Sequence, residues 1–188
     1  KPRPINSLID VASGTGDIAQ IFSKKTFGKS KISCVEPNEE MLGLGKNKLA
    51  EFKNITWHCS SAENLPFEDN KFDFYTISFG IRNVTNINLC LKEAYRVLKS
   101  GGRFMCLEFS KIENEILKNL YKRYSKIIPL MGKYVVGSSI PYEYLVESIE
   151  KFYDQKELSK IIKDNGFSKV EFRNLSNGIS AIHSGWKI

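Results

Sequence analysis

The stretch LIDVASGTGD, from Leu8 to Asp17, joins an apolar run to a tight Gly-x-Gly turn and then to an acidic residue. Such a run before a glycine turn is typical of a buried parallel strand that leads into a helix. Residues 14–19 also satisfy the degenerate dinucleotide-binding pattern G-x-G-x-x-G/A, and Glu36 lies 20 residues beyond Gly16, where a ribose-binding acid is expected. The stretch therefore predicts a nucleotide-type ligand at the end of the first strand.

Apolar runs bounded by turn residues alternate with helical periodicity through the first part of the chain. This alternation indicates a parallel sheet with crossover helices. The strands that we expect are Ser7–Ala12, Lys31–Val35, Ile55–Cys59, Phe72–Ser78 and Arg103–Phe109. The helices that we expect are Asp17–Phe27, a helix capped by Asn38 that runs to about Ala50, and a helix that begins near Ile87 and stops at Gly101 and Gly102.

The alternation breaks after Phe109, and we predict a helical insertion at about residues 111–153 over the substrate side of the sheet. Residues 154–157 form a capping box, DQKE, which opens a helix that ends at Gly166. Lys169–Asn174 and Gly178–Trp186 then make two antiparallel strands around a turn at residues 176–178. The 188 residues thus predict a single α/β domain with a mostly parallel seven-stranded sheet closed by a hairpin. Its ligand crevice is expected at the carboxyl ends of the first, second and fourth strands.

Charge favours one class of ligand at the glycine turn. A pyrophosphate would meet Asp10 and Asp17, and like charges a few Å apart repel. S-adenosylmethionine reverses that sign because it carries an ammonium and a sulfonium, and it still offers a ribose and an adenine. For this cofactor we expect Gly14 and Gly16 to admit the methionine part, Glu36 to accept the ribose hydroxyls, Ser61, Ala62 and Glu63 to line the adenine, and Ser78 to close the floor. An NAD-dependent oxidoreductase is the alternative.

Composition sets further bounds. The formal charge of +7 favours an anionic partner, nucleic acid or a membrane surface, but the lysines are dispersed, as on solvated helix faces. The four cysteines show no CxxC spacing, and three lie in apolar strand-like runs at Cys34, Cys59 and Cys106, which predicts reduced core thiols in a cytosol-like compartment. No His/Cys/Asp cluster has metal-ligand spacing, so we expect no metal. No apolar run approaches the ~18 residues that span a bilayer.

Two longer segments carry a family resemblance. FGIRNV at Phe79–Val84 and YRVLKSGGRFMCLEFS at Tyr95–Ser110 closely resemble the ubiquinone/menaquinone biosynthesis C-methyltransferase family, and Tyr144–Ile149 and Gly178–Lys187 extend the resemblance to nearly the whole chain. It implies a Rossmann-like class I methyltransferase fold with helices on both faces of the sheet. It also implies methyl transfer from S-adenosylmethionine to a ring carbon of a polyprenylated benzoquinol or naphthoquinol, with S-adenosylhomocysteine as product. The family's cofactor contacts fall on Thr15, Glu36, Ser61, Ala62 and Ser78.

The chain departs from the family at two places. The family's Lys-Pro-Gly-Gly turn is Lys-Ser-Gly-Gly here, at residues 99–102, and serine also suits turns. The first strand begins within a few residues of Lys1, so we expect that a natural N-terminal segment is missing. In the family that segment carries a tyrosine- and histidine-containing motif over the active site.

Arg82 and Asn83 are the candidate catalytic residues, because they follow the fourth strand at the crevice mouth. A guanidinium there would stabilise phenolate charge or orient a water that serves as base. His58 lies within a predicted strand, and we expect a core role for it, whereas His183 lies on the last strand, where the resemblance requires no catalytic role. The alternative for Arg82 is an ion pair with a surface acid, and for Asn83 a turn cap.

The resemblance also bears on partners and compartment. Tyrosines and phenylalanines between Tyr121 and Tyr153 are candidates to line a channel for an isoprenoid tail, with peripheral membrane docking nearby. An Asn/Asp-Pro-Pro-Tyr clamp and a Pro-Cys nucleophile are both absent, so we expect no nucleic acid partner. The remaining expectations are a cytoplasmic or inner-membrane location in bacteria, the matrix side in mitochondria, and a homodimer or a quinone-biosynthesis complex. A non-catalytic scaffold of such a complex is a further alternative.

Overall fold

The computed structural model describes residues 6–112 and 140–188, with the backbone alone for 140–143. Most of the insertion predicted at 111–153 therefore lies outside the described residues. So do three of its tyrosines, Tyr121, Tyr124 and Tyr134, and of Tyr142 only the backbone is described. Among the described residues no helix is long and apolar enough to cross a membrane.

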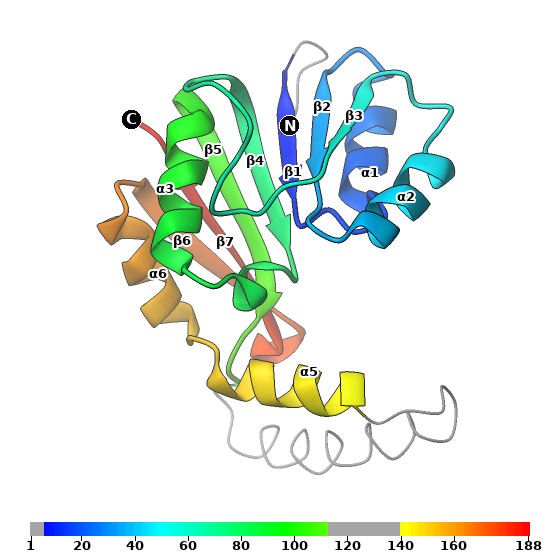
Figure 1. Ribbon diagram of the computed structural model, residues 1–188. Coiled ribbons are helices and arrows are strands. Elements are labelled where there is room, and N and C mark those ends of the chain that lie inside the picture. The colour runs from blue at the N-terminus through cyan, green and yellow to red at the C-terminus, as the bar shows by residue number, and fades with distance from the viewer. Residues whose placement is uncertain (1–5, 113–139) are drawn as a thin grey trace.

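Seven strands form one sheet in the order β3-β2-β1-β4-β5-β7-β6 (Figure 1). Their bounds are β1 (Leu8–Val11), β2 (Ile32–Val35), β3 (Ile55–His58), β4 (Phe72–Ser78), β5 (Leu98–Phe109), β6 (Ser168–Leu175) and β7 (Ser180–Trp186). The first five strands pair in parallel, and β7 pairs antiparallel with both β5 and β6. The predicted parallel sheet with a C-terminal hairpin is confirmed.

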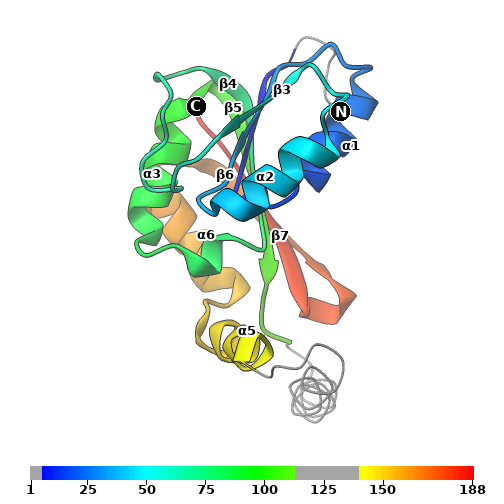
Figure 2. The ribbon, with the colours of Figure 1, turned by 45° about the vertical axis from the view of Figure 1, so that its right-hand side comes forward.

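The helices take positions that local sequence signals set. Their bounds are α1 (Asp17–Lys25), α2 (Glu39–Lys48), α3 (Ile87–Val97), α5 (Ile140–Lys151) and α6 (Gln155–Asp164). Asn38 caps α2 by accepting a hydrogen bond from the Met41 backbone N–H, and Asp154 forms the predicted capping box with Glu157. As Figures 1 and 2 show, α1 packs against β1 and β2, and α2 packs against β3. On the other side, α3 packs against β5, and α6 packs against β6 and β7.

The core lies between the central strands and these helices. Ile9, Val11, Tyr75, Ile77 and Phe104 are buried in one continuous apolar cluster. Strands of a parallel sheet that are covered on both faces are buried along their length, as all four residues of β1 are. The rigid central strands thereby hold the loops at their carboxyl ends.

The end of α3 differs from the prediction. The helix stops at Val97, not at the glycine pair, and β5 begins at Leu98 rather than at Arg103. Leu98 is buried and pairs with Phe72, so it belongs to the sheet. The two glycines instead lie where the pairing of β5 with β4 shifts in register. Gly101 has φ +76°, and a Cβ at Gly102 would lie 2.7 Å from the Lys99 carbonyl oxygen.

The cysteines differ in one respect as well. Cys34, Cys90 and Cys106 are free and buried, whereas Cys59 is exposed. Strand β3 is the edge of the sheet and ends at His58, so a residue just beyond it leaves the core. The prediction of a core thiol was therefore wrong for Cys59.

Candidate active site

The loops after β1, β2 and β4 meet at one edge of the sheet. These strands are parallel neighbours, so their carboxyl ends lie side by side, at the lower edge in Figure 1. The short helix η1 (Ile81–Asn83) follows β4 there, and α5 lies beyond it and contacts it. A crevice at such an edge is where open α/β sheets bind their ligands.

The two glycines of the turn have different physical roles. Gly14 has φ +54°, and a Cβ built on it would be in ordinary van der Waals contact with Met41 Cε at 3.7 Å, so its glycine is required by the backbone conformation and not by a clash. Gly16 has φ +81°, and a Cβ there would lie 2.7 Å from Leu49 Cδ1 and 2.9 Å from the Trp57 ring. The absent side chain of Gly16 thus serves packing inside the protein, and its contact with the methionine part of the cofactor stays a prediction.

Glu36 fastens the glycine turn to the start of α2. Its side chain is largely buried, with Oε2 accepting from the Gly14 backbone N–H at 2.8 Å and Oε1 accepting from the Asn38 N–H at 3.0 Å. A carboxylate has about four lone-pair sites, so these two bonds leave acceptor capacity for ribose hydroxyls. Glu36 lies directly after β2, as expected, and its contact with a ribose stays a prediction.

Asp10 lies beneath the turn and not on its surface. It is 1% exposed, and its Oδ1 accepts from Thr76 Oγ1 at 2.6 Å. Burial raises the pKa of Asp10 to about 7, while the hydrogen bonds from Thr76 and the Ala19 backbone act in the opposite direction. Asp10 therefore supports the loop from below, and its carboxyl is partly protonated near neutral pH.

Thr15 and Asp17 face outward, toward α2. Lys48 Nζ donates to Asp17 Oδ1 at 2.7 Å and to Thr15 Oγ1 at 3.1 Å in an exposed cluster. With Asp17 paired to a lysine and Asp10 partly neutral, the negative charge that we expected at the turn is smaller than the sequence indicates. Glu36 remains the carboxylate that bonds directly to the turn.

The loop after β3 carries Ser61 and Ala62 and is tied to the start of α3. Glu63 Oε1 accepts from the Thr85 backbone N–H at 2.7 Å and from the Asn86 N–H at 3.2 Å. Ala62 is buried, and Ser61 closes a turn with its carbonyl to the Asn64 N–H at 3.3 Å. Ser78 is the last residue of β4 and pairs with Leu107 in the sheet. Glu63 thus anchors a backbone, a role different from the adenine contact expected of it.

Gly80 belongs to the site although sequence reasoning missed it. A Cβ at Gly80 would overlap the Cβ of Ala12, the residue after β1, which itself has φ +50°. The missing side chain lets the loop after β4 lie directly against the glycine turn. The one available signal was a glycine between a strand end and Arg82.

Arg82 pairs with a buried acid that the sequence analysis did not single out. Its Nη1 donates to Glu108 Oε1 at 2.8 Å and to the Phe79 carbonyl at 2.6 Å, and its guanidinium stacks over the Phe109 ring at 5.3 Å. Asn83 is exposed, and its Oδ1 accepts from the Tyr144 hydroxyl of α5 at 3.3 Å. The alternative of a surface pair for Arg82 does not hold, because Glu108 is 1% exposed.

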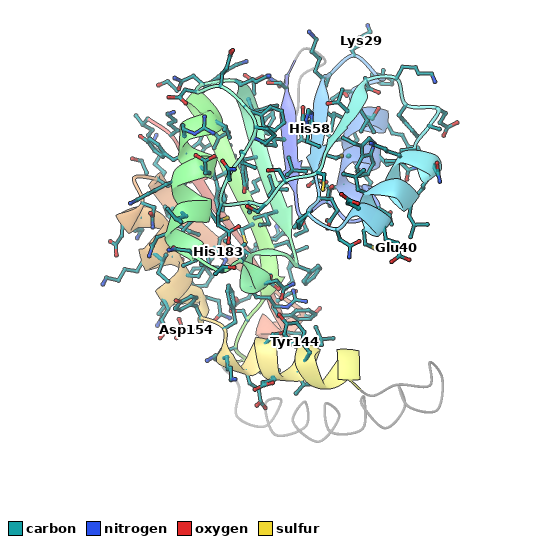
Figure 3. All side chains as sticks on the ribbon, viewed as in Figure 1. Lys29, Glu40, His58, Tyr144, Asp154 and His183 are labelled. Atoms are coloured by element: carbon teal, nitrogen blue, oxygen red, sulfur yellow. The ribbon has the colours of Figure 1, made fainter. Side chains whose placement is uncertain are left out.

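A pocket of about 440 Å³ opens between η1, the start of α3 and α5. Its apolar lining includes Ile81, Val84, Ile87 and Phe152, and its polar lining includes Arg82 and Tyr144. In Figure 3, Tyr144 lies at the α5 end of the molecule, far from Lys29 at the opposite end. Of the candidate catalytic residues, Arg82 lines the pocket, and Asn83 next to it bonds to Tyr144 of the lining.

The two histidines lie away from this pocket. His183 is buried, and its Nε2 lies 2.9 Å from the Gln155 carbonyl, with burial lowering its pKa. His58 stacks against Phe67, and its pKa is lowered by burial and then by Lys71 and Lys46. Among residues 6–112 and 140–188, no group of His, Cys, Asp and Glu side chains has the arrangement of a metal site.

The strand order, the glycine turn after β1 and the acid after β2 are those of the class I methyltransferase fold. A methyltransferase of this kind from Aquifex aeolicus superposes with a TM-score of 0.71 at 19% identity, over 97% of this chain and 82% of that one. The [4+2]-cyclase SpnF superposes with a TM-score of 0.73 at 16% identity, over 97% and 75% of the two chains. Since a cyclase shares the fold, the fold alone does not fix the reaction.

The chain belongs to the ubiE/COQ5 methyltransferase family, whose sequence model matches residues 1–187. The ubiquinone/menaquinone biosynthesis C-methyltransferase UbiE of Rickettsia prowazekii is 51% identical over 100% of this chain and 78% of its own length. The mitochondrial 2-methoxy-6-polyprenyl-1,4-benzoquinol methylase of Gallus gallus is 44% identical over 100% of this chain and 72% of its own. The predicted family, fold and enzyme class are confirmed, and the NAD-dependent oxidoreductase is set aside.

Proposed function

We propose that this chain methylates a ring carbon of a polyprenylated benzoquinol or naphthoquinol in ubiquinone/menaquinone biosynthesis, with S-adenosylmethionine as methyl donor. The observation that carries the proposal is the position of Arg82 and Asn83. Both lie on one short helix that borders the 440 Å³ pocket and abuts the glycine turn through Gly80. The names of the relatives in Rickettsia and Gallus support the quinol class.

The residues at the glycine turn fit the cofactor. Gly14 carries no side chain that would block a ligand, and the carboxylate of Glu36 next to it suits hydroxyl donors and repels phosphate. Ser61, Ala62 and Ser78 stand on the neighbouring loops, and Asp10 holds the turn from beneath. When bound, S-adenosylmethionine supplies an electrophilic methyl group on a sulfonium.

The residues around the pocket suit a quinol with an apolar tail. Arg82 presents a guanidinium at the pocket wall, which stabilises negative charge that develops on a ring oxygen. Asn83 orients the same ring or a bound water, and Tyr144 contacts it from α5. Val84, Ile87 and Phe152 offer apolar surface to the first isoprenoid units.

The location and assembly follow from the substrate. A polyprenyl quinol resides in a membrane, so the enzyme works by peripheral contact at the bacterial inner membrane or on the matrix side in mitochondria. Relatives with bacterial and mitochondrial names support both settings. A homodimer or a quinone-biosynthesis complex is the assembly that we propose, without a nucleic acid partner.

A paired assay tests the function. We expect calorimetric binding of S-adenosylmethionine but not of NAD, and mass-detected methylation of a demethylated benzoquinol or naphthoquinol. Glu36→Gln is expected to weaken cofactor binding about tenfold or more, because an amide nitrogen would face a backbone N–H in place of an acceptor. The matched control is Glu39→Gln, an exposed acid in the first turn of α2. Cofactor binding without turnover on either quinol would favour the non-catalytic scaffold instead.

A further inference from the structure

We propose that Glu108 is the positioning residue for Arg82, holding one edge of the guanidinium so that the rest of it serves the substrate. This inference rests on the proposed function, in which Arg82 faces the quinol. Glu108 lies near the end of β5, two strands from the glycine turn, and its side chain does not line the pocket. It therefore acts through Arg82 and not on the substrate itself.

The carboxylate of Glu108 is held from several directions. Its Oε1 accepts from Arg82 Nη1 and from the Phe109 backbone N–H, both at 2.8 Å, and its Oε2 accepts from the Arg82 backbone N–H at 3.3 Å. The side chain is 1% exposed, so it has little freedom to move. Since Glu108 binds both the backbone and the side chain of Arg82, it fixes the start of η1 together with the guanidinium.

The guanidinium keeps donors that the protein does not use. Nη1 is occupied by Glu108 and the Phe79 carbonyl, whereas Nε is buried with no hydrogen-bond partner. Nη2 makes no hydrogen bond within the described part of the chain. An arginine has five N–H donors in a rigid fork, so fixing one nitrogen sets the direction of the others. The unused Nη2 donors remain for an oxygen of the substrate, and the unpaired Nε lies buried on the same edge of the guanidinium.

Aromatic rings fix the plane of the guanidinium. The Phe109 ring lies 5.3 Å from Arg82 Cζ, and Phe79 stacks on Phe109 with ring centroids 4.8 Å apart. The ion pair with Glu108 prevents the guanidinium from rotating within its plane, and the Phe109 ring prevents it from tilting out of that plane. Two neighbouring residues of β5, Glu108 and Phe109, thus form a cradle for Arg82.

The charge balance of the pair also points to positioning. Burial raises the pKa of Glu108, and the charge of Arg82 with the hydrogen bonds to the carboxylate offsets this rise only in part. A buried pair that served stability alone would be replaceable by apolar side chains and would satisfy its donors. Here a donor is left unpaired beside a pocket.

A double-mutant cycle on the full chain tests the proposal. Glu108→Gln is expected to lower kcat about tenfold to a hundredfold and to leave the cofactor affinity unchanged, because only the aim of Arg82 is lost. Arg82→Ala is expected to lower kcat at least as much, and adding Glu108→Gln to it should cause no further loss. The acid limb of the kcat pH profile should move to higher pH in Glu108→Gln, since the ring hydroxyl then ionises less readily.

Controls separate positioning from folding. Asp73→Asn removes a half-buried carboxylate that is paired with Lys99 at 3.1 Å at the opposite end of the sheet, and it should leave kcat and its pH profile unchanged. If Glu108→Gln does not fold, Glu108→Asp replaces it, because it keeps the charge but shortens the reach, and the same loss is expected.

The outcomes discriminate between the two proposals. Multiplied losses in the double variant would overturn positioning, because Glu108 would then act independently of Arg82. Unchanged kcat in Glu108→Gln, with a loss in Arg82→Ala, would overturn positioning alone. Unchanged kcat in Arg82→Ala would instead remove the role of Arg82 from the proposed function.

Discussion

Three carboxylates near the glycine turn behave differently because their surroundings differ. Asp10 is buried and close to half protonated at neutral pH, Asp17 is exposed and paired with Lys48, and Glu36 is bonded to two backbone N–H groups. The sequence shows three acids of equal formal charge. Their different surroundings give Asp10 a supporting role beneath the turn, place Asp17 on the surface and leave Glu36 on the side of the ligand.

The raised pKa of Asp10 makes stability depend on pH. The folded state binds a proton up to about pH 7, whereas the unfolded chain releases it near 3.8, so this contribution is present below pH 3.8 and is lost as pH rises toward 7. At about 1.4 kcal/mol per pKa unit, the loss between pH 4 and 7 is at most about 4 kcal/mol. We expect Asp10→Asn to remove this slope, measured by urea unfolding at several pH values.

The difference between variant and wild type isolates Asp10 from other titrating groups. The amide that Asp10→Asn introduces next to the Ala19 N–H lowers the free energy of unfolding by an amount that does not vary with pH. The test is therefore the slope of the free energy of unfolding against pH, and not its absolute value. A variant whose stability changes with pH in parallel with the wild type would show that Asp10 is not protonated in the folded state.

At the scale of elements, helix starts were predicted and one helix end was not. Asn38 and Asp154 cap their helices through bonds to residues three or fewer positions away, so a short window of sequence contains the whole cause. The end of α3 depends on Leu98 pairing with Phe72, which lies on another strand. The glycine pair that suggested a helix stop belongs to an irregular strand, and local sequence does not distinguish the two cases.

Two glycines of α2 provide a matched test of packing between elements. A Cβ at Gly45 would overlap the Trp57 ring of β3, whereas a Cβ at Gly43 would meet nothing within 4 Å. We expect Gly45→Ala to destabilise the protein by about 1–3 kcal/mol through overpacking. Gly43→Ala should stabilise it by about 0.5–1 kcal/mol, because alanine favours helix. Thermal and urea unfolding measure both, and equal effects in the two variants would contradict the packing of α2 on β3.

At the scale of the whole molecule, the sequence predicted which loops form the site but not how they bond. The strand order brings the loops after β1, β2 and β4 together, and this follows from the alternating pattern. The contacts of Arg82 with Glu108, of Glu63 with Thr85 and of Gly80 with Ala12 each join segments at least 22 residues apart. Such pairs depend on packing of the complete sheet, so no local pattern contains them.

The distribution of charge over the molecule leads to a last prediction. The pocket that we assign to the isoprenoid tail lies at the α5 end, whereas Lys29 lies at the opposite end and Lys31 is close to it in the chain (Figure 3). A lipid substrate enters from the membrane, so the α5 end should face the bilayer. We expect the chain to float with phosphatidylglycerol vesicles at low salt, and to float less at about 0.5 M salt, where charge interactions are screened.

The double variant Lys29→Glu, Lys31→Glu lowers the formal charge of +7 by four without touching the α5 end, and it should still float. Loss of flotation in that variant would place docking at the opposite end from the pocket, and no flotation of the wild type would remove the membrane contact from the proposed function.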